Sequence, residues 1–261
     1  MNIDAIETGI VVPTLGTRPE YLEQCLLSIR DAGGAFINIV TPSVEALVAQ
    51  LNPNLYDVIT SDPGGGLSNA INVGIRTLPE HLRFVNWLGD DDLLMPNAIA
   101  LATSTLRQNP RTVLVYGGCR YINGNGDLLW NNKSGSYAKF LMRCGPQLIP
   151  QPGALFRRSA FEQIGGLQAK YKWAFDLDML IRLSRFGNLQ YIHQTLASFR
   201  WHEGSLSVGG REGSVREASD IRVAALPRSL RSISPLWEIP LRKIILNAGN
   251  RVTRRNKQKP A

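Results

Sequence analysis

The chain has 261 residues, 44% of them hydrophobic, and a formal net charge of +8. This length and composition allow a large buried core, which argues against intrinsic disorder and fits one α/β domain or a domain with an appendage. Three cysteines, Cys25, Cys119 and Cys144, are odd in number and far apart, which argues against a disulfide framework and a zinc cluster. Because we find no secretory signal and no apolar stretch of roughly 18 residues, we expect a cytoplasmic protein.

The positive charge is concentrated at the C-terminal end. Residues 1–220 hold 19 Lys and Arg against 20 Asp and Glu, whereas residues 221–261 hold 10 basic residues and one acid, Glu238. The main body is therefore electrostatically ordinary. Its partners cannot be inferred from the high isoelectric point.

The first hundred residues alternate between short apolar strands and amphipathic helices. We predict strands at 9–14, 36–40, 56–60 and 84–88, and helices at 18–32, 44–51 and 67–77. This alternation predicts an α/β fold with a Rossmann-like, mostly parallel central sheet flanked by helices. Ligands of such sheets bind beyond the carboxyl ends of the strands.

The second half is less regular. We predict strands at 113–116 and 128–130, joined through a turn at 123–126, then helices at 159–164 and 176–186, and finally strands at 189–193 and 197–201.

Three consecutive carboxylates, Asp90, Asp91 and Asp92, follow the predicted strand at 84–88 and precede Pro96. Adjacent anions repel one another, so a fold that gathers them at a strand end is suited to a divalent cation. The alternative is a polar turn with an aspartate at a helix N-cap, which needs only one of the three.

A glycine run, Gly64 to Gly66, separates the third predicted strand from the helix at 67–77. Glycines let the backbone approach a phosphate or a sugar closely. The spacing matches neither a P-loop nor the dinucleotide-binding glycine motif, so a flexible turn is the alternative.

A second acidic site contains Asp176 and Asp178 at the start of a largely apolar helix. The two residues point about 200° apart around a helix, so they cannot serve one function from one face. One carboxylate in this apolar setting is a candidate general base, while Asp178 can pair with Arg182 at i+4. An N-cap aspartate with a surface ion pair is the alternative.

His202 follows the predicted strand at 197–201 and precedes a glycine-containing loop at 203–213. An imidazole beside carboxylates suits a Mn²⁺-like ion better than Mg²⁺. A lone histidine is more often structural than a metal ligand.

In order and spacing, these motifs resemble the inverting family 2 glycosyltransferases, which have a nucleotide-sugar-binding fold called GT-A. The resemblance covers about residues 9–208. It rests on five segments: Val11 to Thr14 with Arg18 and Leu22, Gly66 to Ile75, Leu88 to Pro96, Gln151 to Arg157 with Phe161 to Gly166, and Asp176 to Leu183.

The resemblance implies a role for each motif. Asp176 would be the general base, Asp91 the chief metal ligand, and His202 a further ligand of Mn²⁺ or Mg²⁺. Asp92 would be a second ligand or a supporting residue, and the loop at 203–213 a lid. The implied donor-binding residues are Pro13, Thr14, Arg18, Asp62, Gly66, Asn72 and Asp90.

The implied activity is inverting transfer of a sugar from a nucleotide-diphosphate donor to a saccharide or lipid-linked acceptor in cell-surface polysaccharide biosynthesis. Residues 1–115 would bind the donor, residues 116–215 would supply the acceptor site and the base, and residues 216–261 would form a helical basic extension. Many members carry an acid after the second strand that binds uracil; this chain has none there, so UDP is only the default. Gly89 replaces the motif's first acid.

Two rival functions remain at this point. A nucleotidyltransferase of related fold would be expected to carry a glycine-rich loop with a basic residue after the first strand, where this chain offers only Arg18. A non-catalytic glycan- or membrane-binding relative is the other rival, and the intact Asp91 and Asp176 argue against it.

The basic tail, residues 235–261, joins an apolar helix to a cluster of arginines and lysines. Such a segment is suited to the anionic face of a membrane, where a lipid-linked acceptor would lie. A helix packed on the domain with a solvated end is equally compatible. Nucleic-acid binding ranks lowest, because the last ten residues contain no interleaved aromatics.

Overall fold

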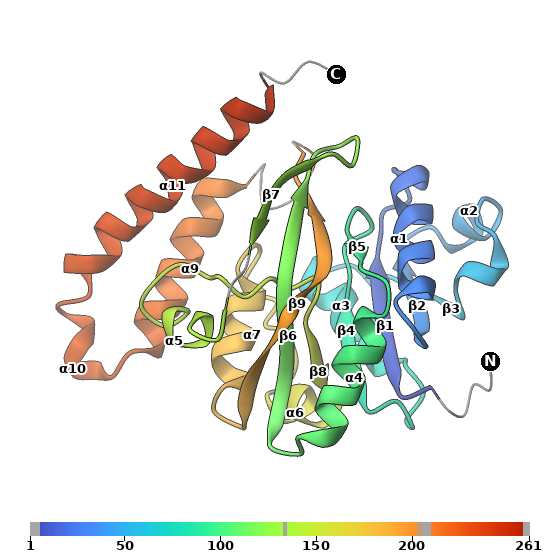
Figure 1. Ribbon diagram of the computed structural model, residues 1–261, viewed down its shortest axis with the longest axis horizontal. Coiled ribbons are helices and arrows are strands. Elements are labelled where there is room, and N and C mark those ends of the chain that lie inside the picture. The colour runs from blue at the N-terminus through green and yellow to red at the C-terminus, as the bar shows by residue number, and fades with distance from the viewer. Residues whose placement is uncertain (1–5, 133–134, 203, 205–209, 258–261) are drawn as a thin grey trace.

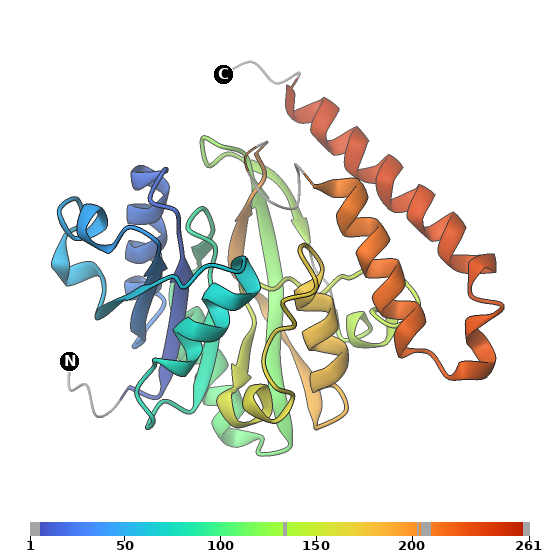
Figure 2. The same cartoon turned by 180° about the vertical axis from the view of Figure 1, so that it is seen from behind.

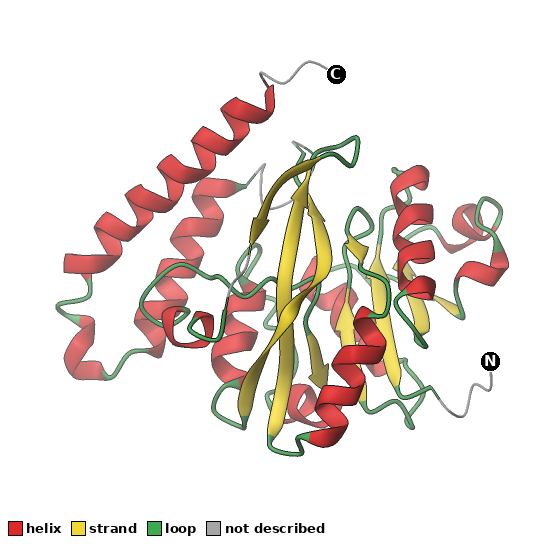
Figure 3. Ribbon diagram, viewed as in Figure 1, coloured by secondary structure: helices red, strands yellow, loops and turns green. Residues whose placement is uncertain are grey.

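A mixed sheet runs through the part of the chain that the computed structural model describes, residues 6–132, 135–202, 204 and 210–257. Within these residues the sheet has nine strands in the order β3-β2-β1-β4-β8-β6-β9-β5, with β7 paired to β6 (Figure 3). The α/β class predicted from the sequence is confirmed.

The parallel part of the sheet comes from the first half of the chain. Its strands are β1 (Thr8–Pro13), β2 (Phe36–Thr41), β3 (Val58–Ser61) and β4 (Phe84–Trp87), and they pair with one another in parallel. The connecting elements are α1 (Pro19–Asp31), α2 (Val44–Val48), the 3₁₀ turn η2 (Pro53–Leu55) and α3 (Leu67–Arg76). Helix α3 lies directly on β1 because Gly74 has no side chain. A Cβ there would meet Cγ1 of Val11 at 2.5 Å.

The second half contributes mixed strands and short helices. They are β5 (Leu93–Leu94), α4 (Ala98–Gln108), β6 (Thr112–Ile122), β7 (Leu128–Asn132), α5 (Ala138–Leu141), β8 (Leu155–Arg157), α6 (Arg158–Gln163), α7 (Phe175–Leu183) and β9 (Asn188–Arg200). Strand β6 pairs in parallel with β9 and antiparallel with β7 and β8.

One sequence expectation was wrong here. The strands predicted at 189–193 and 197–201 form a single strand, β9, because it follows β6 along its whole length. The pairing of β9 with β6 shifts register around Gly118, so β9 continues although its apolar pattern is interrupted. Five further elements, η2, β5, α4, α5 and β8, were not predicted; β5 and β8 are too short to show a periodicity.

The core lies on both faces of the sheet. Side chains alternate along β1, so that Val11 packs in one cluster whereas Ile10 and Val12 pack in the other. Helices α3 and α7 cover the first face, and α1 and α4 cover the second (Figures 1 and 2). The sheet is thus enclosed between helical layers.

Three C-terminal helices, α9 (Arg211–Ala225), α10 (Arg228–Arg231) and α11 (Pro235–Lys257), lie beside the sheet (Figure 2). Helix α9 packs between α7 and α11. Arg222 and Glu238 join α9 to α11 through a buried bidentate pair, with N···O distances of 2.8 and 2.7 Å. Among the described residues we find no helix with the length and apolar character needed to cross a bilayer.

We predict that Glu238→Ala destabilises the protein by about 3–5 kcal/mol, because it leaves the Arg222 guanidinium buried without its counter-charge. Replacing both residues by Met and Leu should recover most of this loss. The free energy of unfolding in urea measures the effect. Glu162→Ala, which removes an exposed i,i+4 partner of Arg158, is the control and should cost less than about 1 kcal/mol. Equal losses in the two variants would contradict a structural role for the buried pair.

Candidate functional site

The aspartate triplet lies at the carboxyl edge of the sheet. Strand β4 ends at Trp87 and delivers Asp90 to Asp92 next to the end of β1, with which β4 pairs in parallel. The short strand β5 then pairs with β9, which brings His202 to the same edge. Segments about 190 residues apart in the sequence therefore meet here (Figure 1).

Asp90 is buried and has two partners. Its Oδ2 accepts a hydrogen bond from Thr14 Oγ1 at 2.6 Å, and its Oδ1 pairs with Arg18 Nη2 at 2.7 Å. Burial raises the pKa of Asp90, while Thr14 and Arg18 partly offset that rise. Thr14 and Arg18 were predicted to bind the donor, and the structure places both directly against the triplet.

Asp91 has the opposite electrostatic character. Its Oδ2 lies 2.9 Å from Arg18 Nη1 and 2.8 Å from His202 Nε2, and these two nitrogens are 3.1 Å apart. Burial acts to raise the pKa of Asp91, but the hydrogen bond from His202 and the charge of Arg18 bring it below its usual value. Asp91 is therefore an anion at neutral pH.

Asp92 lies deeper, with 4% of its surface exposed. Its Oδ1 accepts the backbone N–H of Arg200 at 2.9 Å, while the Arg200 guanidinium donates to the backbone oxygen of Asp91. Burial, followed by the charge of Asp91, raises the pKa of Asp92 well above its usual value. The structure does not bring Asp92 to the contact between Asp91 and His202.

The donor atoms at this edge suit a divalent cation. A carboxylate oxygen of Asp91 and an imidazole nitrogen of His202 stand side by side, and Mn²⁺ accepts both atom types. Gly89 leaves space here, because a Cβ would lie 2.8 Å from Asp91 Oδ1 and 3.3 Å from Asp92 Oδ2. Within the residues that the structure describes, no group of three or more His, Cys, Asp and Glu side chains is arranged to hold a metal.

The glycine loop, Gly64 to Gly66, is held by hydrogen bonds with two flanking side chains, those of Asp62 and Asn69. Gly64, Gly65 and Gly66 have φ values of 81°, 88° and 93°, which favour glycine. Asp62 Oδ1 accepts the N–H of Gly64 at 2.9 Å, and Asn69 Nδ2 donates to the oxygen of Gly64 at 2.6 Å. The loop ends at Gly66, the N-cap of α3, so free N–H groups of that helix face the same edge as the end of β3.

Pro13 and Asn72, two other residues predicted to bind the donor, have structural partners. Pro13 closes β1 opposite Val40 of β2. The side-chain amide of Asn72 donates to the oxygen of Leu167 at 2.8 Å and accepts its N–H at 2.9 Å. Asn72 therefore fastens α3 to the segment that follows α6.

Asp176 lies in the first turn of α7. Its Oδ2 accepts a hydrogen bond from Gln147 Nε2 at 2.7 Å, and its Oδ1 accepts the N–H of Leu177 at 2.8 Å. Burial raises the pKa of Asp176, and these hydrogen bonds moderate the rise. Asp178 instead pairs with Arg182 at 2.5 Å, as its i+4 spacing predicted.

Sequence reasoning missed the residue that caps α7. Glu217, on α9, accepts the backbone N–H groups of Lys172, Trp173 and Ala174 at 2.9, 2.7 and 2.6 Å. These groups precede α7, whose first turn carries Asp176. Because Glu217 lies more than forty residues away, no local motif could have identified it.

An aromatic cluster was also missed. It consists of Tyr121, Trp130, Phe199 and Trp201, from β6, β7, β9 and the residue after β9, and the rings of Tyr121 and Trp130 stack at 4.2 Å. Burial is the main cause that raises the pKa of Tyr121, and the nearby groups that add to it include Asp92 and Asp176. Tyr121 is thus close enough to both acidic sites to feel their charge. The only sequence signal was the aromatics themselves on three neighbouring strands.

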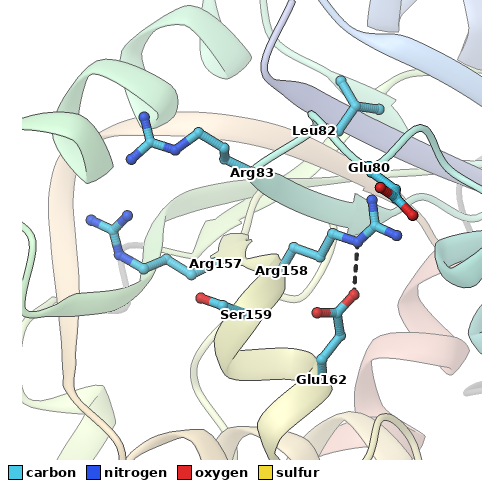
Figure 4. A pocket seen from close by; sticks show the side chains of 7 residues that line it. All are labelled: Glu80, Leu82, Arg83, Arg157, Arg158, Ser159 and Glu162. Atoms are coloured by element: carbon cyan, nitrogen blue, oxygen red, sulfur yellow. Dashed lines mark hydrogen bonds and ion pairs between the residues drawn. The ribbon is translucent and has the colours of Figure 1, made fainter.

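A cavity of about 500 Å³ lies elsewhere, lined by Glu80, Leu82, Arg83, Arg157, Arg158, Ser159 and Glu162 (Figure 4). Arg83 precedes β4, whereas the triplet follows it, so the cavity is at the opposite edge of the sheet. Arg157 and Arg158 donate to backbone oxygens of neighbouring segments, and Arg158 also pairs with Glu162. The cavity is therefore separate from the candidate site.

The predicted lid at 203–213 lies mainly outside the described residues, and its end, from Arg211, belongs to α9.

We compared the sequence with those of known proteins. No family model matches the chain. It is 24% identical over 151 residues to a chondroitin synthase of Pasteurella multocida, covering 58% of this chain and 15% of that protein. It is 23% identical over 236 residues to the O-antigen biosynthesis protein RfbC of Myxococcus xanthus, covering 85% of this chain and 18% of that protein.

Solved structures show the same architecture. The mannosyltransferase PcManGT from Pyrobaculum calidifontis, in complex with GDP-Man and Mn²⁺, matches 94% of this chain and 75% of its own with a TM-score of 0.64 and 15% identity. S. aureus TarS 1–349 matches 91% of this chain and 71% of its own, with a TM-score of 0.62 and 12% identity. The chain therefore has a GT-A-like α/β fold, the fold that the motifs predicted.

We predict that Asp176→Asn stabilises the protein at pH 7, because a carboxylate whose pKa is raised by burial opposes folding once it is ionised. The folded state binds more protons between the unfolded pKa of about 3.9 and the raised pKa, so wild-type stability falls as pH rises through that window. The melting temperature of the variant should exceed that of the wild type at pH 7, and the difference should shrink towards pH 4. Asp220→Asn, at an exposed position of α9, is the control. A variant less stable than the wild type at pH 7 would contradict the expectation.

Proposed function

We propose that this protein is a metal-dependent inverting glycosyltransferase that moves one sugar from a nucleotide-diphosphate donor to a saccharide or lipid-linked acceptor in polysaccharide biosynthesis. The observation that carries the proposal is geometric: Asp91 Oδ2 lies 2.8 Å from His202 Nε2, whereas the oxygens of Asp176 accept hydrogen bonds from Gln147 and Leu177. The pKa of Asp91 is lowered by His202 and Arg18, whereas that of Asp176 is raised by burial. Environments that push two pKa values apart assign an electrostatic role to one acid and proton transfer to the other.

The cation would be held by Asp91 and His202, whose donor atoms already adjoin, together with the donor diphosphate. When bound, it would supply positive charge to the diphosphate as that group leaves. Mn²⁺ is the first candidate because of the imidazole ligand, and a structural relative was solved with Mn²⁺. Of the two roles expected for Asp92, second ligand or supporting residue, its hydrogen bond with the Arg200 backbone favours the supporting one.

Asp176 would act as the general base. Gln147 and the N–H of Leu177 hold its two oxygens in fixed directions, and the raised pKa makes the carboxylate a stronger proton acceptor. Asp176 would take the proton of an acceptor hydroxyl while that oxygen forms a bond to the anomeric carbon. The bond to the diphosphate oxygen breaks on the opposite face, which inverts the configuration.

The donor site would include Arg18 and Asp90 on one side and the Asp62 to Gly66 loop on the other. Arg18 bridges Asp90 and Asp91, so its cation is suited to a diphosphate that enters beside them. UDP remains the default nucleotide, and GDP becomes a second candidate because a structural relative was solved with GDP-Man. Asn72 would position the loop rather than contact the donor.

The acceptor would lie against the aromatic cluster. Indole and phenol rings present flat apolar faces with a polar tip, which suit the faces and hydroxyls of a pyranose ring. The rings of Trp130 and Trp201 meet edge to face at 5.5 Å beside Tyr121. Two of the relatives named above act on or build polysaccharides according to their names, which agrees with a saccharide acceptor.

We predict that Asp91→Ala and Asp176→Asn each reduce sugar transfer by about 10²- to 10⁴-fold, the range that loss of a catalytic group produces. The assay measures nucleoside diphosphate released from UDP- and GDP-sugars with Mn²⁺ and a panel of saccharide acceptors. Asp31→Ala and Asp220→Asn, which remove exposed acids from α1 and α9, are the matched controls and should retain full activity. Near-normal turnover in either site variant would refute the assignment, and release of pyrophosphate would favour a nucleotidyltransferase.

We further predict that UDP or GDP with Mn²⁺ raises the melting temperature, because a ligand present at 100 times its Kd stabilises the folded state by about 2.7 kcal/mol. A thermal-shift screen compares each nucleotide alone, each metal alone and the combinations, with Mg²⁺ beside Mn²⁺. Asp91→Ala should lose the part of the shift that depends on metal, and Asp31→Ala should keep it. If no combination shifts the wild-type protein, the proposed donor site is wrong.

A further inference from the structure

An exposed apolar ridge lies on the outer side of the two last helices. Its members, from the end of α10 into α11, are Leu230, Ile233, Leu236, Ile239 and Ile244, which are 41%, 47%, 78%, 44% and 64% exposed. Single exposed apolar side chains are ordinary, whereas five within fifteen positions are an unusual concentration. We call this set the C-terminal ridge.

The C-terminal ridge faces away from the rest of the protein. In α11, Leu236, Ile239 and Ile244 fall within an arc of about 140° at 100° per residue, so they share one half of the helix surface. The other side carries Glu238, which is buried against Arg222 of α9. Figures 1 and 2 agree that α11 is the outermost helix, with α9 between it and α7.

The surface around the C-terminal ridge is cationic. Among the described residues from 221 to 251, the one acid is Glu238, and it is buried and paired. Arg228, Arg231, Lys243 and Arg251 are exposed there. The sequence continues with four more basic residues before residue 261.

We infer that the C-terminal ridge is a docking face for an anionic phospholipid bilayer. Apolar side chains on one side of a helix enter the boundary between headgroups and acyl chains, while neighbouring lysines and arginines attract anionic headgroups. A second copy of this chain is the poorer occupant. Apposing two copies of this face would bring like charges together without an exposed acid to offset them.

Docking through α11 would also bring the candidate site towards the bilayer. Asn250, near the C-terminal end of α11, accepts a hydrogen bond from Arg211 at 2.8 Å, and the Arg211 guanidinium lies 5.4 Å from the ring centre of Trp201. Trp201 belongs to the aromatic cluster and is followed by His202. In Figure 1 the C-terminal end of α11 lies at the same end of the molecule as the carboxyl ends of β6 and β9. A lipid-linked saccharide would thus be presented on the side where the proposed acceptor site opens.

Sedimentation with vesicles of phosphatidylcholine alone, or mixed with phosphatidylglycerol, tests this inference on the full chain without donor or acceptor. The wild type should bind the mixed vesicles, and raised salt should weaken that binding. The triple variant Leu236→Ser, Ile239→Ser and Ile244→Ser should bind roughly tenfold or more weakly. The matched control is Leu27→Ser, Leu128→Ser and Phe186→Ser, at positions 46–47% exposed on other elements, and should bind like the wild type.

The inference is overturned if the wild type does not bind mixed vesicles, if it binds neutral vesicles as well as mixed ones, or if both triple variants lose binding equally. It is also overturned if light scattering shows a dimer that only the ridge variant dissociates, because a second copy would then cover the face. Should the ridge variant misfold, Lys243→Glu with Arg251→Glu must weaken binding instead. The inference goes beyond the proposed function, and Asp176→Asn separates the two, since it should keep vesicle binding while losing transfer.

Discussion

The burial of three adjacent carboxylates at one sheet edge is the constraint on which the rest of the structure depends. Each carboxylate loses contact with water on folding, and the three charges repel one another. Each carboxylate therefore needs a hydrogen-bond or ionic partner. Thr14 and Arg18 serve Asp90, and Arg18 also serves Asp91 together with His202. Asp92 accepts the backbone N–H of Arg200, the last residue of β9. Because these partners come from the ends of β1 and β9, the charges tie the two halves of the sheet together.

The second acidic site depends on helices that carry no recognisable motif. Helix α7 begins where it does because Glu217 of α9 accepts three backbone N–H groups just before it. Helix α9 is in turn held to α11 by the buried pair of Arg222 and Glu238. The C-terminal helices thus fix the direction of Asp176, although they lie outside the central sheet. Their basic composition alone gave no hint of this positioning role.

Sequence patterns predicted the elements that have a periodicity of their own. Strand β1 and helices α1 and α3 show regular apolar spacing and were predicted within two residues of their ends. Strand β9 was predicted as two pieces because its continuity comes from pairing with β6, which a single segment cannot reveal. The acids of the candidate site could be recognised in the sequence as a motif. The partners Gln147, Glu217 and Arg200 could not, because no local pattern marks them. Each of these meets its partner through the fold, between 29 and 109 positions away.

The position of Arg18 links the proposed metal and the proposed donor. Arg18 already places a positive charge 2.9 Å from Asp91 Oδ2, so a divalent cation beside Asp91 would meet a like charge. A nucleotide diphosphate carries the negative charge that offsets both cations at once. Its binding therefore favours the metal, and by reciprocity the metal favours the donor to the same extent. Asp176 needs no such partner for its proposed role as general base, because burial keeps its pKa raised even though the hydrogen bond from Gln147 moderates the rise.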